Sequence, residues 1–211
     1  MSRSSGSRRA GVSRDGLAAM ALCAPVRVDP PGALRTARML LRPLTAADEA
    51  AYIGAVQSSR RELHACMPVH KEGETDVQMF TRQLRVVGEE QAAGKCFRCV
   101  GVLEDGRIAG GFNLNAISRG LEWRADLAWW VATPLTGRGL ATEGVTALLD
   151  HALADLPVGL GLHRVHAWIT RENAASVRVA EKAGMVLDAG ARSFLDTGSN
   201  WALHDRYTRE V

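Results

Sequence analysis

One stretch of the chain, residues 121–169, limits the possible folds more than any other. Apolar and polar side chains alternate over residues 121–131, which is the period of a β-strand. Apolar residues then follow the spacing of an amphipathic helix over 140–156, which Pro157 ends. Residues 164–169 read as a second, shorter strand. A strand, a helix and a strand in this order predict a parallel crossover.

The remaining elements predict a sheet that is mostly antiparallel. Two strands meet through Asp105 and Gly106, a pair that supplies the positive φ angles of a tight hairpin. Thr45 and Thr75 each open a helix with a capping-box pattern. We therefore expect a mixed α/β (α+β) sheet of about seven strands with helices on both faces. The predicted strands are 38–44, 96–103, 107–117, 121–131, 164–169, 189–195 and 201–209, and the predicted helices are 45–59, 75–94, 140–156 and 173–183.

Composition indicates one globular domain behind a short arm. Of the 211 residues, 46% are hydrophobic and 23% charged, which argues against a mainly disordered chain. Residues 1–33 are predicted to form a flexible basic arm that ends at Pro30-Pro31-Gly32, and residues 34–211 form the domain. The arm carries five arginines against two aspartates, so it accounts for the whole net charge of +3. A neutral body disfavours a dedicated nucleic-acid-binding protein.

Hydropathy argues against a membrane protein. No window offers about 18 uninterrupted apolar residues, so we expect no transmembrane helix and no membrane partner. The expected location is the cytoplasm.

The turn between the long strand and its helix indicates an anion-binding site. Gly137 and Gly139 allow backbone N–H groups to approach a ligand, and the helix start adds unsatisfied donors and partial positive charge. Arg138 adds a full charge. The loop lacks the lysine of a Walker motif and misses the third glycine of the dinucleotide pattern. The alternative is that the glycines only form a turn and a helix cap.

Several motifs in the right order resemble one enzyme family. Thr136-Gly-Arg-Gly-Leu-Ala141 resembles the Q/R-x-x-G-x-G/A loop of the GNAT superfamily of N-acetyltransferases, although Thr136 departs from the usual Gln or Arg. Residues 34–48 and 173–185 resemble the RimJ/RimL-like branch, the ribosomal-protein-alanine N-acetyltransferases. The final hairpin, with Arg192, Trp201, Asp205 and Tyr207, is similar as well.

The resemblance implies a cofactor site and a mechanism. It implies a sheet whose fourth and fifth strands splay apart, acetyl-CoA as cosubstrate, and no metal. A main-chain N–H near Val131 would polarise the thioester carbonyl, so that an amine attacks it directly without a covalent intermediate. The cofactor-binding residues implied are Trp130, Val131, Thr136, Gly137, Arg138, Gly139, Leu140, Ala141 and Asn173.

Two residues are candidates for proton transfer. Asp126 lies on the polar face of the long strand and is the candidate base for the attacking amine. By resemblance, Ser176 is the candidate acid for the departing CoA thiolate, one helical turn from Asn173. The alternatives are that Asp126 is an ordinary surface residue, that Asn173 caps the helix and that Ser176 faces solvent.

The expected acceptor is a primary amine. Within the branch, the resemblance implies the N-terminal α-amino group of a protein, ribosomal in type. Other hypotheses are acetylation of a small amine or antibiotic, and a non-catalytic acyl-CoA-binding domain. The basic arm is a candidate for docking on ribosomal RNA, and a homodimer is compatible with this interpretation.

Cysteine and histidine spacing does not favour a metal site. Cys96 and Cys99 have CxxC spacing, but residues three apart in a strand point to opposite faces, and no second pair accompanies them. The six histidines are scattered without ligand spacing. Cys66 stands where related sequences often carry tryptophan, so it marks an unusual acceptor-side loop.

Overall fold

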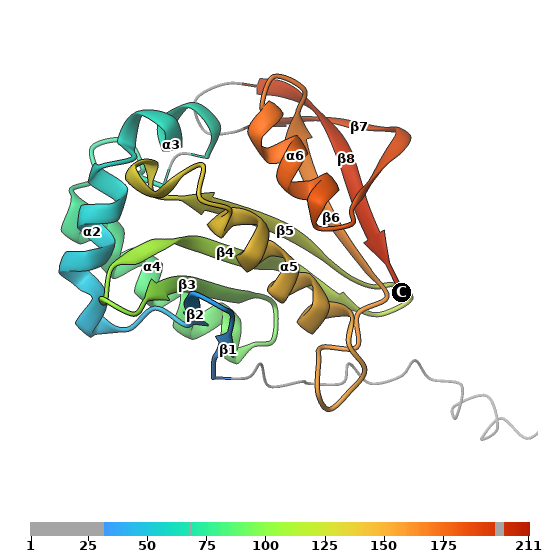
Figure 1. Ribbon diagram of the computed structural model, residues 1–211, viewed down its shortest axis with the longest axis horizontal. Helices are drawn as coiled ribbons and strands as arrows, with labels where there is room; N and C mark the ends of the chain where they lie inside the picture. The colour runs from blue at the N-terminus through green and yellow to red at the C-terminus, as the bar shows by residue number, and fades with distance from the viewer. Residues whose placement is uncertain (1–31, 68, 197–200) are drawn as a thin grey trace, which may run out of the picture.

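The computed structural model describes residues 32–67, 69–196 and 201–211, which form one eight-stranded mixed sheet with helices packed on it (Figure 1). The strand order is β1-β2-β3-β4-β5-β6-β8-β7. The strands are β1 (Leu34–Arg35), β2 (Met39–Arg42), β3 (Phe97–Leu103), β4 (Ile108–Arg119), β5 (Trp123–Val131), β6 (Arg164–Thr170), β7 (Val186–Asp196) and β8 (Trp201–Glu210).

All neighbouring strands pair antiparallel except β5 and β6, which are parallel. The crossover predicted from residues 121–169 is thus confirmed, and so is the mostly antiparallel sheet. The eighth strand is β1, a two-residue edge strand that pairs with β2 and that is too short to leave a periodic pattern.

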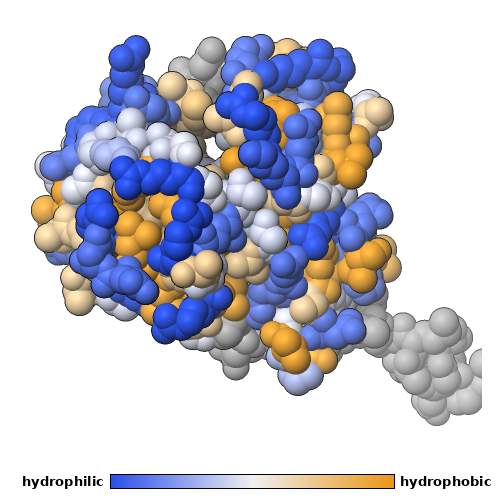
Figure 2. Space-filling view, in the orientation of Figure 1, coloured by the Kyte–Doolittle hydropathy of each residue, from blue (hydrophilic) through white to orange (hydrophobic). Residues whose placement is uncertain are grey.

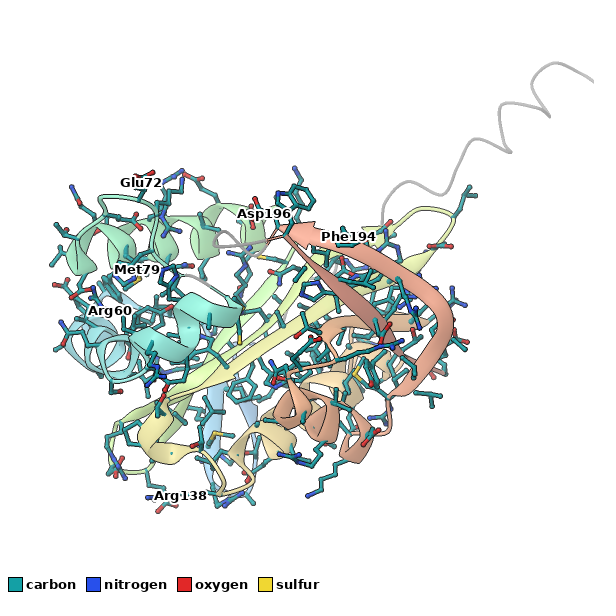
Figure 3. All side chains as sticks on the ribbon, turned by 90° about the horizontal axis from the view of Figure 1, so that it is seen from above. Arg60, Glu72, Met79, Arg138, Phe194 and Asp196 are labelled. Atoms are coloured by element: carbon teal, nitrogen blue, oxygen red, sulfur yellow. The ribbon has the colours of Figure 1, made fainter. Side chains whose placement is uncertain are left out.

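Helices cover both faces of the sheet, as Figure 3 shows. On one face, Tyr52 of α2 (Glu49–Gln57) packs against Phe80 of α4 (Asp76–Ala92) and edge-on against Trp130 of β5. On the other face, α5 (Leu140–Leu153) lies against β4, where Phe112 meets Gly144, and α6 (Ala174–Lys182) packs beside it.

The prediction of one continuous helix over residues 45–59 is wrong. The structure has a 3-10 turn, η1 (Ala46–Asp48), followed by α2, and a separate helix α3 (Arg60–Cys66) follows where a loop was expected. The break has a physical cause at Ser59, which is 1% exposed. Its hydroxyl donates to the carbonyl of Ala55 and accepts from the N–H of Thr133 at 2.9 Å, so the chain is fixed to the end of β5.

The helix predicted for 140–156 is three residues shorter in the structure. Its last carbonyls are occupied by N–H groups from the following loop: Leu160 donates to His151, Gly161 to Ala154 and Leu162 to Ala152. These bonds need the loop backbone close to the helix, and Gly159 provides the space, since a Cβ there would lie 2.3 Å from the carbonyl oxygen of Ala154. The turn therefore closes the helix before Pro157 is reached.

Other local predictions are confirmed. Gly106 turns the β3–β4 hairpin with φ of +81°, and Gly94 and Gly184 follow their helices with positive φ. The capping box at Thr75 and Gln78 is present. The proposed arm, except for residues 32 and 33, lies outside the described residues, and so do residues 197–200 between the last two predicted strands. No helix in the described ranges has the length and apolarity needed to cross a membrane.

The contact between α5 and β4 yields a stability prediction. In Gly144→Ala the new Cβ would lie 2.3 Å from the Phe112 ring, so the free energy of unfolding should fall by about 1–3 kcal/mol. Gly88→Ala is the matched control, because it also lies inside a helix but has nothing within 4 Å of the added carbon. It should be neutral or stabilise the fold by up to about 1 kcal/mol. Urea unfolding of both variants measures the difference, and equal losses would contradict this packing.

Candidate functional site

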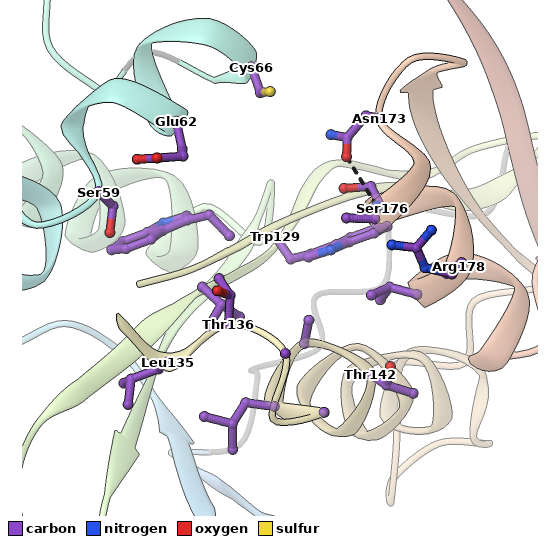
Figure 4. A pocket seen from close by; sticks show the side chains of 18 of the residues that line it. Ser59, Glu62, Cys66, Trp129, Leu135, Thr136, Thr142, Asn173, Ser176 and Arg178 are labelled. Atoms are coloured by element: carbon purple, nitrogen blue, oxygen red, sulfur yellow. Dashed lines mark hydrogen bonds between the residues drawn. The ribbon is translucent and has the colours of Figure 1, made fainter. Parts of the chain in front are cut away.

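A cavity of about 500 Å³ lies where the end of β5, the glycine loop, α6 and α3 meet. Figure 4 shows side chains entering it from α3 on one side and from α6 on the other, with Trp129 between them. Eight of its lining residues were predicted as cofactor-binding from the sequence, and Ser176 lines it as well. Those eight are Trp130, Val131, Thr136, Gly137, Gly139, Leu140, Ala141 and Asn173.

The cavity exists because β5 and β6 part. They pair only where residues 124–126 meet residues 164–166. Beyond this point β6 continues to Thr170 along β8, whereas β5 follows β4 to Val131. The N–H of Ala132 donates to Ala109 on β4 at 2.8 Å, so the alternation of a strand turns the N–H of Val131 towards the gap.

The glycine loop has the backbone geometry of an anion cradle. Gly137 and Gly139 adopt φ of +73° and +79°, values that other residues rarely take, and Gly139 is the N-cap of α5. The first N–H groups of α5 therefore point out of the helix beside the loop, with the positive end of its dipole. This arrangement favours a phosphate or another anion at the mouth of the cavity.

An ion-pair cluster around Glu143 holds this loop in place. Glu143 lies in the first turn of α5, where it accepts from Thr36 Oγ1 at 2.6 Å and from Arg38 Nε at 2.7 Å. Another guanidinium nitrogen of Arg38, Nη1, donates to the carbonyl oxygen of Arg138 at 2.8 Å. Burial raises the pKa of Glu143, but these hydrogen bonds outweigh it and the net pKa is lowered. The carboxylate is thus neutralised by Arg38 beside the anion cradle.

The side chain of Arg138 lies elsewhere. It is exposed and lines a separate, shallow depression with Arg38 and Arg107 rather than the main cavity. Its backbone remains part of the glycine loop. The predicted contact of Arg138 with the cofactor stays a prediction.

Helix α6 and its N-cap bring four polar side chains to the cavity, and two of them were predicted from the sequence. Asn173 Oδ1 accepts from the N–H of Ser176 at 3.1 Å, so Asn173 is the N-cap of α6 while it also lines the cavity. Arg178 and Lys182 line the cavity as well. Their i, i+4 spacing, which puts them on one face of α6, was the available signal, but exposed basic residues on helices are too common to single out.

A second cavity of about 280 Å³ adjoins the first at the gap between β5 and β6. Its own walls include Trp168 and Thr170 of β6, Glu172, and His204 of β8. Five residues line both cavities, and they mark the place where the two spaces meet: Cys66, Met67, Trp129, Asn173 and Ser176. A ligand in the first cavity could therefore react with a molecule that enters through the second.

Asp126, the predicted base, lines neither of these two cavities. It lies at the last β5–β6 pair, opposite His166 and two residues before Ala128, which does line the second cavity. Its Oδ1 is buried without a hydrogen-bond partner in the described part of the chain, 3.7 Å from Arg124 Nη1. The role of Asp126 stays a prediction.

The cysteines and histidines form no metal centre in the described ranges, where no three metal-ligating side chains converge. Burial raises the pKa of Cys96 to about 11 and raises that of Cys99 further, the opposite of a reactive thiolate. His166 is buried beside Thr208, and its pKa is lowered mainly by burial. His163 stacks on Trp123 at the far end of β5.

Comparison with known protein families identifies the family to which this fold belongs. The model of the acetyltransferase (GNAT) domain matches residues 38–186. The chain belongs to the GNAT acetyltransferase family. The match begins just before β2 and ends at the start of β7, so it includes the glycine loop, the strand gap and α6.

This GNAT chain matches a curated protein over part of its length. The chain is 32% identical over 100 residues to "Probable N-acetyltransferase YjcK" of Bacillus subtilis, and the match covers 47% of this chain and 53% of that protein. The chain thus spans about half the length of the curated relative it matches.

Solved structures show the same fold. RimJ of Mycobacterium smegmatis, in complex with CoA-disulfide, has a TM-score of 0.73 at 24% identity and covers 85% of this chain and 86% of its own. RimL, a ribosomal L7/L12 α-N-protein acetyltransferase in complex with coenzyme A, has a TM-score of 0.73 at 15% identity, with coverages of 85% and 98%.

The cap on α6 yields a prediction about stability. Asn173→Ala removes the acceptor for the Ser176 N–H, so the free energy of unfolding should fall by about 0.5–2 kcal/mol. Asn173→Asp keeps an oxygen in the cap position and should retain most of the stability. Thermal unfolding of the two variants measures the cap. If the alanine variant unfolds at the temperature of the unchanged protein, the cap contributes nothing.

Proposed function

We propose that this protein is an acetyl-CoA-dependent N-acetyltransferase that transfers the acetyl group directly to a primary amine. The observation that carries the proposal is the pair of cavities that meet where β5 and β6 part. One cavity has an anion cradle in its wall, and the other shares five lining residues with it beside the gap between the strands. A thioester and an amine can then meet in a ternary complex.

In this proposal the first cavity holds the cofactor. The N–H groups of the loop from Thr136 to Ala141 bind the pyrophosphate, assisted by the start of α5. Arg178 and Lys182 add positive charge on the facing helix, where the phosphates of CoA pass. The pantetheine arm extends along the open edge of β5 past Trp130 and Val131, and Asn173 contacts it from α6. The cofactor fits here because the donors are backbone N–H groups and cations, which suit its phosphates.

The transfer step follows from this placement. The thioester carbonyl accepts a hydrogen bond from the N–H of Val131, which stabilises the oxyanion that forms as the amine nitrogen attacks the carbonyl carbon. The tetrahedral intermediate then collapses, the C–S bond breaks and CoA leaves as a thiolate. Ser176, at the junction of the two cavities, is the proposed donor of the proton that the thiolate takes up, and its hydroxyl regains a proton from solvent at the same time.

The proposed acceptor is the N-terminal α-amino group of a protein. Support comes from the names of the structural relatives, among which RimL acts on a ribosomal protein at its α-nitrogen. Because ribosomal proteins are made in the cytoplasm, the proposal carries a cytoplasmic location with it. A small amine or antibiotic as acceptor is the alternative, and a non-catalytic acyl-CoA-binding domain is the second.

Calorimetric titration tests the cofactor site. We expect acetyl-CoA to bind with a Kd in the low micromolar range or below, which is a binding free energy of about −8 kcal/mol. ATP should give no binding signal. Desulfo-CoA should bind comparably because it keeps the phosphates. Absence of binding by both CoA species would contradict the whole proposal.

The same titration measures the cations on α6. Arg178→Gln and Lys182→Gln should each weaken acetyl-CoA binding by about 10-fold, the size of a lost charge-assisted hydrogen bond. Arg85→Gln on α4 is the control, since Arg85 is an exposed helix residue that pairs only with Glu89 among the described side chains. An equal effect of all three changes would indicate general charge rather than a site.

Turnover of variants tests the proton-transfer residues. Ser176→Ala should lower kcat and leave the Kd for acetyl-CoA unchanged, because the hydroxyl acts only when the thiolate departs. The hypothesis that Asp126 is the base predicts that Asp126→Asn abolishes turnover and spares CoA binding. Stopped assays with an N-terminal peptide measure both, and full turnover of a variant removes that residue from the reaction.

A further inference from the structure

The second cavity contains a buried histidine, His204, which has no ligand spacing in the sequence. His204 lies on β8 opposite Thr170 of β6, and it is only 7% exposed. It lines the second cavity together with Thr170, Asn173 and Ser176. The amine that reaches the junction of the two cavities would therefore pass this imidazole.

One hydrogen bond fixes the tautomer of His204. Its Nδ1 lies 2.9 Å from the carbonyl oxygen of Ala202, and a carbonyl oxygen can only accept. Nδ1 therefore carries the proton. In the neutral ring Nε2 then has a free lone pair, and it is the nitrogen left to meet a ligand in the cavity. The same hydrogen bond, together with burial between β6 and β7, holds the ring in one orientation.

The surroundings of His204 leave it as the best-suited base on this side of the gap. The other titratable side chains that line the second cavity are Cys66 of α3 and Glu172, both exposed. Neither of them is buried, whereas the imidazole of His204 is held in the cavity wall by burial and by the carbonyl of Ala202. On its own strand, the neighbour on the same face is Arg206, which is paired with Asp188 of β7. Below it on β6, His166 contacts Thr208.

We propose that His204 is the base that takes the proton of the acceptor amine, an inference that rests on the proposed function. The neutral amine nitrogen attacks the acetyl carbonyl carbon, the C–N bond forms, and the carbonyl electron pair moves to oxygen. Nε2 of His204 takes the excess proton from nitrogen and becomes imidazolium. The C–S bond breaks, the thiolate receives a proton through Ser176, and the imidazolium returns its proton to solvent. The products are the N-acetyl amine and CoA.

Attack by a neutral amine also favours one acceptor class. An α-amino group has a pKa of about 7.7–8.0 and a lysine side chain about 10.4, so near neutral pH a far larger fraction of the α-amine is in the reactive form. Peptides with a free α-amine should therefore be acetylated faster than peptides whose only amine is a lysine.

The first experiment uses the unaltered protein. The pH dependence of kcat is measured between about pH 5.5 and 9 with two short peptides whose N-terminal amines differ in pKa. We expect activity to fall at low pH with a midpoint that is the same for both peptides, because it belongs to the enzyme. An acidic limb that follows the pKa of each peptide, or no limb at all, would overturn the proposal.

Variants then test whether His204 causes this fall of activity at low pH, the acidic limb. His204→Asn keeps an N–H that can donate to the Ala202 carbonyl but has no base, and His204→Gln places an amide near the position of Nε2. Both should lower kcat at neutral pH by at least about 100-fold, lose the acidic limb and keep the Kd for acetyl-CoA. His163→Asn is the control, since it removes an exposed histidine far from the cavities. In His204→Ala, added imidazole should restore part of the rate.

The outcomes separate this inference from the proposed function. If the unaltered protein binds acetyl-CoA but acetylates none of the peptides or small amines tested, the proposed function fails before any variant is made. If the protein turns over and either His204 variant keeps its rate and its limb, only the role of His204 fails. A limb that is lost in Asp126→Asn and kept in His204→Asn would assign the base to Asp126 instead.

Discussion

Everything in this protein that bears on chemistry depends on the short pairing between β5 and β6. Three residue pairs hold the two strands together, and then each follows its other neighbour. A sheet normally satisfies the N–H and C=O groups of its inner strands on both sides, so opening it exposes main-chain groups at its centre. The opening is tolerated because β4 pairs with residues 126–131 of β5, and β8 pairs with β6 over residues 164–170. This pairing holds the exposed edge of β5 in place, as the proposed contact between its N–H and an oxyanion requires.

The two cavities on either side of the strand gap also differ in the charged side chains of their walls. Cations and the start of α5 lie at the mouth of one cavity, while the other cavity has histidine, glutamate and tryptophan in its walls. In the proposed reaction, these side chains suit an anionic cofactor on the first side and an amine on the second. Electrostatics as well as shape would then orient the two substrates. The junction is formed by side chains from α3, β5 and α6, three elements that are distant in sequence.

Much of the fold could be predicted from the sequence because its signals are local. The alternation over residues 121–131 and the capping box at Thr75 each depend on neighbours within a few positions. The glycine loop was recognisable for the same reason, because the positive φ angles at Gly137 and Gly139 strongly favour glycine at both positions. The helix α3 was missed because its position is fixed by a long-range bond between Ser59 and Thr133. Periodicity carries no information about such a bond. His204 was missed likewise, because pairing across β6 and β8 is what brings it to a cavity.

The cluster of Thr36, Arg38 and Glu143 has a consequence for the limits of the domain. These contacts join the turn between β1 and β2 to the first turn of α5 and to the backbone of Arg138. The glycine loop is therefore tied to the far edge of the sheet, more than a hundred residues earlier in the chain. A fragment that starts at β2 would contain every residue that lines the cavities and would still leave Glu143 as an uncompensated negative charge beside the anion cradle. The structural unit that neutralises Glu143 thus begins before β2, at the turn that carries Thr36 and Arg38.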